Sequence, residues 1–136
     1  DLMSVVDYAV NHLKIKHVVV CGHYGCGGVK AAISNTDFNQ VLNMWLRNIK
    51  DIYRIHRKEL ELISDENKKV DRLVEINVKE QVFNLAKTAI IQKAWSSEQR
   101  PDLHGWVYDL HDGIIKPVVE MKAGIDIDPL YEFEGL

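Results

Sequence analysis

The most chemically distinctive residues of this chain are His23 and Cys26, which lie on a glycine-bordered turn within HVVVCGHYGCGGVKAA (17–32). An imidazole nitrogen and a thiolate sulfur are a pair of ligands that suits tetrahedral zinc. The positive end of a helix dipole also favours the thiolate form of a cysteine at a helix start. The alternative interpretation is a core histidine and a buried free cysteine that flank a turn.

The elements that must position this pair can be read on either side of it. Val18 to Val20 is an apolar, β-branched run, which predicts a strand buried on both faces of a parallel sheet. The glycines that follow allow a tight turn, and a helix restarts from Val29. We therefore expect His23 at the end of a strand and Cys26 at the entry to a helix, where both can converge on one ion.

A second thiol, Cys21, lies two residues before His23. Residues two apart in a strand point to the same face, so Cys21 is a further candidate ligand. A thiol within a valine-rich strand is more often a small core residue, and we favour that interpretation.

The run CGHYGCGGVKAA (21–32), with the apolar strand before it, resembles the second zinc-ligand motif of the β-class carbonic anhydrases. Further matching segments follow in the expected order, and the resemblance extends from Asp1 to about Gly113. These segments are MWLRNIKDIY (44–53), INVKEQVFNLAKT (76–88) and LHGWVYDLHDG (103–113).

The resemblance implies a carbonic anhydrase, a lyase that reversibly hydrates CO2 to bicarbonate and a proton through zinc-bound hydroxide. It implies Zn2+ held by His23 and Cys26 together with the cysteine of a C-x-D-x-R motif. The aspartate of that motif is either on the metal or paired with the arginine. The motif is absent from the 136 residues, so the N-terminal part of the family fold is missing. We expect the chain alone to be inactive.

The resemblance also suggests roles around the zinc. The backbone of Gly27 and Gly28 would shape the substrate pocket. In the allosteric subtype of the family, a tyrosine at the position of Tyr108 takes part in a noncatalytic bicarbonate pocket, so Tyr108 is a candidate bicarbonate-binding residue. His104 and His111 flank it, and we interpret both as solvent-facing strand and turn positions.

Two long segments show helical periodicity. Residues 41–53 carry a wide apolar stripe that includes Trp45, which predicts a helix packed on the core, with a subunit interface as the alternative. Residues 70–95 keep the same period, with Asn77 and Gln81 on the stripe. Buried amides need partners, so we expect both to bond the backbone of a neighbouring element, with a direct catalytic role as the less favoured interpretation.

The remaining pattern completes an α/β fold. Leu103 to Asp109 reads as a strand, and Ile114 to Met121 as its antiparallel partner, with Pro117 typical of an edge strand. We therefore predict a mostly parallel sheet flanked by helices, with one antiparallel edge strand. Residues 1–136 would form a single partial domain, in which 126–136 is a surface tail.

Composition excludes several other classes. A net charge of −3 gives no sign of a nucleic-acid surface, and the apolar runs are too short to span a bilayer. Two cysteines do not make a disulfide framework and fit a reducing compartment, so we predict a cytoplasmic protein, although the absent N-terminal part leaves organellar targeting open. The resemblance implies CO2 and bicarbonate as small-molecule partners and a homo-dimer or homo-tetramer.

Two alternative functions remain at this stage. One is a catalytically silent structural or regulatory module with the carbonic anhydrase fold. The other is a phosphate- or nucleotide-binding α/β domain, because a strand, a glycine-rich turn and a helix can cradle an anion. The glycines from Gly25 to Gly28 match neither G-x-G-x-x-G nor the P-loop pattern, which argues against the second alternative.

Overall fold

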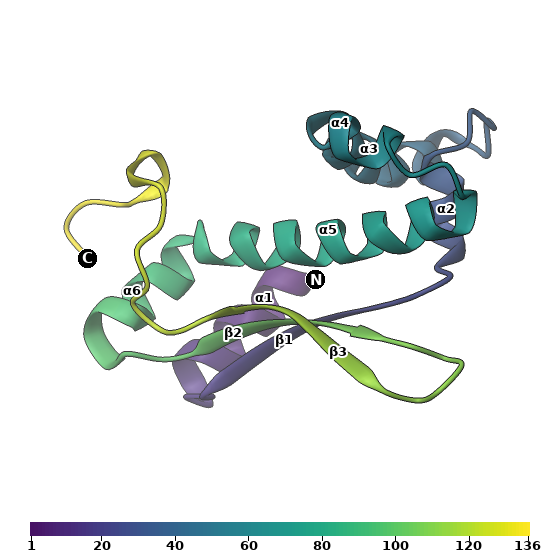
Figure 1. Cartoon of the computed structure of the whole chain (residues 1–136). Helices are drawn as coiled ribbons and strands as arrows, with labels where there is room; N and C mark the ends of the chain where they lie inside the picture. Colours follow the sequence, from purple (N-terminus) through teal and green to yellow (C-terminus); the bar gives the residue numbers. More distant parts are fainter.

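A three-stranded mixed sheet forms the base of the structure (Figure 1). The computed structural model describes all 136 residues. Strands β1 (His17–His23), β2 (Asp102–Tyr108) and β3 (Ile115–Met121) lie in the order β1-β2-β3, with β1 parallel to β2 and β3 antiparallel to it. The predicted α/β fold with flanking helices and an antiparallel edge strand is confirmed. This chain contains one parallel and one antiparallel strand pair.

The longest helix, α5 (Glu66–Ala86), runs along the sheet, and α3 (Gln40–Ile55) and α4 (Arg57–Glu61) lie on the far side of α5 from the strands (Figure 1). The other helical segments are α1 (Leu2–Asp7), the π-helical η1 (Tyr8–His12), α2 (Gly27–Ala32), α6 (Ala89–Glu98) and the 3-10 turn η2 (Pro129–Tyr131).

Two strand glycines allow α5 to approach the sheet closely. A Cβ atom on Gly22 would lie 2.8 Å from Cγ2 of Val78, and one on Gly105 would lie 2.9 Å from Cγ1 of the same valine. The Cβ atom on Gly105 would also lie 2.6 Å from Cγ1 of Val119. The close approach expected at Gly105 is confirmed, because no other residue type fits beneath the helix there.

Helices cover only one face of β1. Its residues alternate between half-buried and exposed positions, and Val19 is 39% exposed. The prediction that Val18 to Val20 is buried on both faces is therefore wrong. The physical reason is that β1 is an edge strand with a helix on one side, so every second side chain, His23 included, lies on the uncovered face.

The buried side chains form two clusters, and α5 contributes to both. The first joins α5 to α2, α3, α4 and β2 (Val29, Ala32, Leu46, Ile49, Ile52, Leu60, Val70, Leu73, Val74, Ile76, Val78, Val107). The second joins its C-terminal half to α1, η1, α6, β2 and β3 (Val6, Val10, Val82, Ala86, Ile91, Ala94, Trp95, Leu103, Met121). A single helix thus ties the region around the candidate ligands to the rest of the fold.

The helical patterns were correct in position and incomplete in detail. The periodic segment 70–95 is split, because Thr88 caps a new helix, α6. Asn77 and Gln81 bond each other, with Nε2 of Gln81 donating to Oδ1 of Asn77 at 3.1 Å, so the expected backbone partners are wrong. On α3, Trp45 is 54% exposed and is no part of the core.

The C-terminal segment is bonded to α6 through the buried amide of Gln92 and through Ser96, whose Oγ donates to the Leu136 carbonyl at 3.2 Å. Nε2 of Gln92 donates to the carbonyls of Ala86 (3.0 Å) and Tyr131 (2.9 Å), and its Oε1 accepts from the Phe133 N–H (3.0 Å). The predicted surface tail therefore follows a defined path across α6, although the side chains of residues 128–136 are exposed.

Candidate metal centre

The two candidate ligands lie at the two ends of one short turn. His23 is the last residue of β1, and Cys26 is the residue that precedes the first turn of α2. His23 is exposed, and its Nδ1 lies 3.2 Å from the carbonyl oxygen of Tyr24. An Nδ1–H that donates to this carbonyl leaves the Nε2 lone pair available to a metal. Cys26 is half-buried against the first core cluster.

No third metal ligand joins this pair. The structure contains no group of three histidine, cysteine, aspartate or glutamate side chains that could hold a metal ion. Cys21 is a free thiol exposed on the uncovered face of β1, so its interpretation as a core residue is wrong, and it does not complete a three-ligand group. Because catalytic zinc sites use three protein ligands, the nitrogen and sulfur donors present fit part of such a site.

Contacts from both the sheet and α5 hold the turn between the ligands. The Tyr24 N–H donates to the carbonyl of Tyr108 at 3.0 Å. The Gly25 N–H donates to Oδ1 of Asp71 at 3.0 Å, and the Tyr24 hydroxyl donates to Oε2 of Glu75. Gly25 has φ +69°, a conformation that glycine adopts without strain.

Glu75 is the buried charge nearest this turn. Its carboxylate accepts from Nη1 of Arg72 and Nζ of Lys116, each at 3.0 Å, and from Tyr24. Burial by itself raises the pKa of Glu75, but the hydrogen bonds from Tyr24, Lys116 and Arg72 outweigh it and hold the pKa below its usual value. Burial and the bond to the Glu75 carboxylate raise the pKa of Tyr24.

Gly27 and Gly28, the two glycines expected to shape the pocket, differ in how closely other atoms surround them. A Cβ atom on Gly27 would meet nothing within 4 Å. A Cβ atom on Gly28 would lie 3.0 Å from Cη2 of Trp45 and 3.8 Å from Sγ of Cys26. The indole of Trp45 thus lies close to the turn that carries Cys26. The apolar stripe in the sequence does not predict this position.

Tyr108 lies beside His23, since the two residues pair in register at the ends of β2 and β1. The side chain of His111 is 95% exposed, as expected for a turn position. The side chain of His104 is only 14% exposed, and its Nε2 lies 3.0 Å from Nδ1 of His17, so the expectation of a solvent-facing His104 is wrong. The partner of His104 lies on the neighbouring strand β1, 87 positions away in the sequence, so the local pattern does not predict it.

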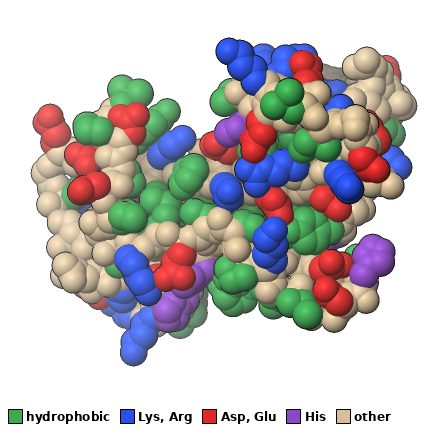
Figure 2. Space-filling view, viewed as in Figure 1, with side chains coloured by type: hydrophobic (Ala, Val, Ile, Leu, Met, Phe, Trp, Pro, Cys, Tyr) green, Lys and Arg blue, Asp and Glu red, His purple; other side chains and the backbone are tan.

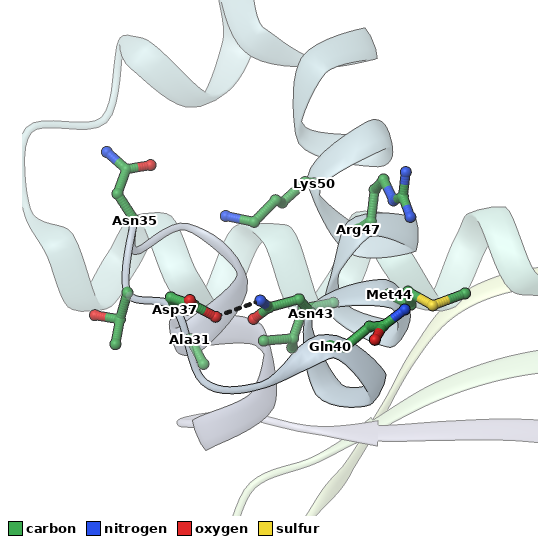
Figure 3. Close-up of a pocket in the computed structure, with 10 residues that line it drawn as sticks. Ala31, Asn35, Asp37, Gln40, Asn43, Met44, Arg47 and Lys50 are labelled. Atoms are coloured by element: carbon green, nitrogen blue, oxygen red, sulfur yellow. Dashed lines mark hydrogen bonds between the residues drawn. The ribbon is translucent and has the colours of Figure 1, made fainter.

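A cavity of about 850 Å³ lies between the 35–37 loop and α3 (Figure 3). Nδ2 of Asn43 donates to Oδ1 of Asp37 at 2.6 Å, and Nζ of Lys50 donates to the carbonyl of Ser34 at 2.8 Å. Neither His23 nor Cys26 lines it. The candidate metal ligands therefore lie outside this cavity.

Acidic and basic side chains are interspersed over the face shown in Figure 2, in keeping with a net charge of −3. None of the helices combines the length and the hydrophobicity that crossing a lipid bilayer requires.

Comparison with known proteins places the chain in a family. Residues 1–115 match the family model described as "Carbonic anhydrase". The chain belongs to the carbonic anhydrase family, and its structural neighbours place it in the β class.

The relatives found by sequence and those found by structure are all carbonic anhydrases. A carbonic anhydrase of Emericella nidulans is 50% identical over 131 residues, a match that covers 95% of this chain and 57% of that protein. The Coccomyxa β-carbonic anhydrase, solved in complex with acetazolamide, superimposes with a TM-score of 0.82 at 36% identity, covering 89% of this chain and 55% of that one. One of two tetrameric β-carbonic anhydrases from Sordaria macrospora gives 0.83 at 36% identity, covering 88% and 61%.

Each of these matches covers only part of the relative's own length. The chain spans between half and two thirds of the length of these relatives, 57%, 55% and 61% respectively. The resemblance to the second zinc-ligand motif onward is thereby confirmed as a match to part of the family fold.

Proposed function

We propose that this chain forms part of a zinc-dependent carbonic anhydrase, which reversibly hydrates CO2 to bicarbonate and a proton. The observation that supports this most strongly is the placement of His23 and Cys26 at the ends of one anchored turn, in a chain that belongs to the family. When bound, zinc supplies the Lewis acidity that makes water nucleophilic near neutral pH.

The chain's own residues have distinct roles in this proposal. His23 and Cys26 bind the metal, and the Gly27 and Gly28 backbone lines the substrate pocket. The close packing of Trp45 on Gly28 supports an apolar wall beside the cysteine. Tyr108 is adjacent to His23 in the sheet, and we propose that it contacts bicarbonate.

We propose that the remaining zinc ligands come from residues outside this chain. Only β2 pairs with β1, so the other edge of β1 has no partner strand beside His23. Residues 1–136 would then be part of one domain. By similarity to the tetrameric relatives from Sordaria macrospora, the assembly would be a homo-dimer or homo-tetramer. Both cysteines are free thiols, which is compatible with the reducing cytoplasm that we propose as its location.

Zinc analysis of a full-length protein that contains these residues tests the metal assignment. We expect one equivalent of zinc in the wild type and in Cys21→Ser, and severe loss in Cys26→Ser. The two variants make the same chemical change five residues apart, and stopped-flow CO2 hydration should follow the zinc content. If Cys26→Ser retained its zinc, the metal assignment would be wrong.

The 136-residue chain alone provides the second test. We expect it to bind zinc weakly and to show no CO2 hydration above the buffer rate, because each missing ligand removes both binding energy and geometry. Rapid CO2 hydration by this chain with stoichiometric zinc would contradict the proposal that residues outside it complete the site.

A further inference from the structure

Two carboxylates of α5 accept hydrogen bonds from Tyr24 and Gly25, the two residues between the candidate ligands. The Gly25 N–H donates to Oδ1 of Asp71 at 3.0 Å, and the Tyr24 hydroxyl donates to Oε2 of Glu75. Asp71 and Glu75 are four residues apart on α5, so their side chains leave the same helix face one turn apart. A rigid helix thus contacts the backbone of one turn residue and the side chain of the other.

Glu75 is itself fixed from several directions. It is 9% exposed, and its carboxylate accepts from Arg72 on the same helix and from Lys116 on β3. A carboxylate held by two cations has little freedom to move, so it is a firm anchor for the Tyr24 hydroxyl.

We infer that Glu75, with Asp71 beside it, is a positioning residue for the metal centre. Glu75 holds Tyr24 and Asp71 holds Gly25, and together they fix the turn through which His23 and Cys26 present their donor atoms. This inference rests on the proposed function, since it assigns these carboxylates a role toward that metal site. Outer partners that orient metal ligands typically change metal affinity 10- to 100-fold, and here the effect would pass through the backbone of the turn.

A cobalt titration of the 136-residue chain tests the role. In a Cys21→Ser background, the thiolate-to-cobalt absorption band reports Cys26 alone. We expect Glu75→Gln to weaken cobalt binding about 10- to 100-fold. Tyr24→Phe, which removes only the hydroxyl, should weaken it as well, and the double variant should be no worse than Glu75→Gln.

Glu59→Gln is the matched control. Glu59 bonds the same Arg72 as Glu75 does, at 2.7 Å, but makes no hydrogen bond to the turn. We expect Glu59→Gln to leave the cobalt affinity and spectrum at their wild-type values. An equal loss of affinity in Glu59→Gln and Glu75→Gln would mean that general destabilisation, and not the grip on the turn, is responsible.

Amide hydrogen exchange of the metal-free chain provides a readout that needs no metal. The Gly25 amide should exchange about tenfold faster or more in Asp71→Ala and in Glu75→Gln, since a hydrogen bond to a charged group is lost or loosened. The amides of α5 should keep their rates.

The outcomes separate the two proposals. Because His23 and Cys26 should still bind cobalt weakly, an absence of uptake at every cobalt concentration would contradict the proposed metal site, while the Gly25 exchange rate still decides whether Glu75 holds the turn. Wild-type exchange at Gly25 in the variants overturns the inference, and so does wild-type cobalt affinity in Glu75→Gln. If Glu75→Gln does not fold, Tyr24→Phe carries the same comparison.

Discussion

Replacing Gly105 with alanine should weaken the contact between α5 and the sheet. The new Cβ atom would lie 2.6 Å from Cγ1 of Val119, 2.9 Å from Cγ1 of Val78 and 3.2 Å from Cγ2 of Val82. All three neighbours are β-branched and restricted at χ1, so none can turn away freely. Relief of the clash must therefore come from movement of the backbone.

The expected cost follows from the overpacking of a filled core. Such insertions typically destabilise by about 1–3 kcal/mol, which for a chain of this size lowers the melting temperature by roughly 4–12 °C. Thermal unfolding followed by circular dichroism measures this change directly. Gly27→Ala is the control, because its Cβ atom meets nothing within 4 Å, and we expect its melting temperature to match or slightly exceed that of the wild type.

A second substitution distinguishes the proposed clash from other causes. In Gly105→Ala with Val119→Ala, the methyl group nearest the new Cβ atom is removed, so part of the lost stability should return. A Gly105→Ala protein that melts at the wild-type temperature would refute the packing of α5 on this strand. A double variant that is less stable by the sum of both single changes would refute the specific contact with Val119.

Three further changes test other contacts. Because the pKa of Glu75 is held below its usual value, its contribution to the free energy of unfolding should be present at neutral pH and lost as the pH falls below about 4.3. Urea unfolding at several pH values measures this loss. In Glu75→Gln, the free energy of unfolding should fall less steeply with decreasing pH than in the wild type. The raised pKa of Tyr24 predicts the opposite sign, a contribution present below about pH 10 and lost as the pH rises through the folded-state pKa, which Tyr24→Phe should remove. Gln92→Ala should cost about 1–3 kcal/mol and make the chain cleavable by protease after residue 122, since the buried amide of Gln92 makes two of the hydrogen bonds that hold that segment. An unchanged digestion pattern would count against this role.

The local order of elements could be read from the sequence with good accuracy. The strand before His23, the helix after Cys26, the stripe on α3 and the antiparallel strand β3 depend on side-chain periodicity and turn residues. These signals come from residues close together in the chain, so they survive without knowledge of the fold. The resemblance to the β-class carbonic anhydrases rests on the same local motifs.

The contacts of α5 with the turn between His23 and Cys26 could not be read in this way. Glu75 bonds the Tyr24 hydroxyl across 51 positions of sequence, and Asp71 bonds the Gly25 amide across 46. In the sequence, both acids look like solvated charges on a helix. Only the docking of α5 over the sheet brings them to the turn.

The burial of β1 also depends on tertiary packing and not on the local sequence. A valine-rich strand predicts two covered faces, yet whether Cys21 is covered depends on how many layers the chain supplies, and here helices cover one face of β1. The sequence by itself determined which residues could donate to a metal and which elements carry them. The tertiary structure decided which of these residues meet, because contact and burial are set by the packing of distant segments and not by local pattern.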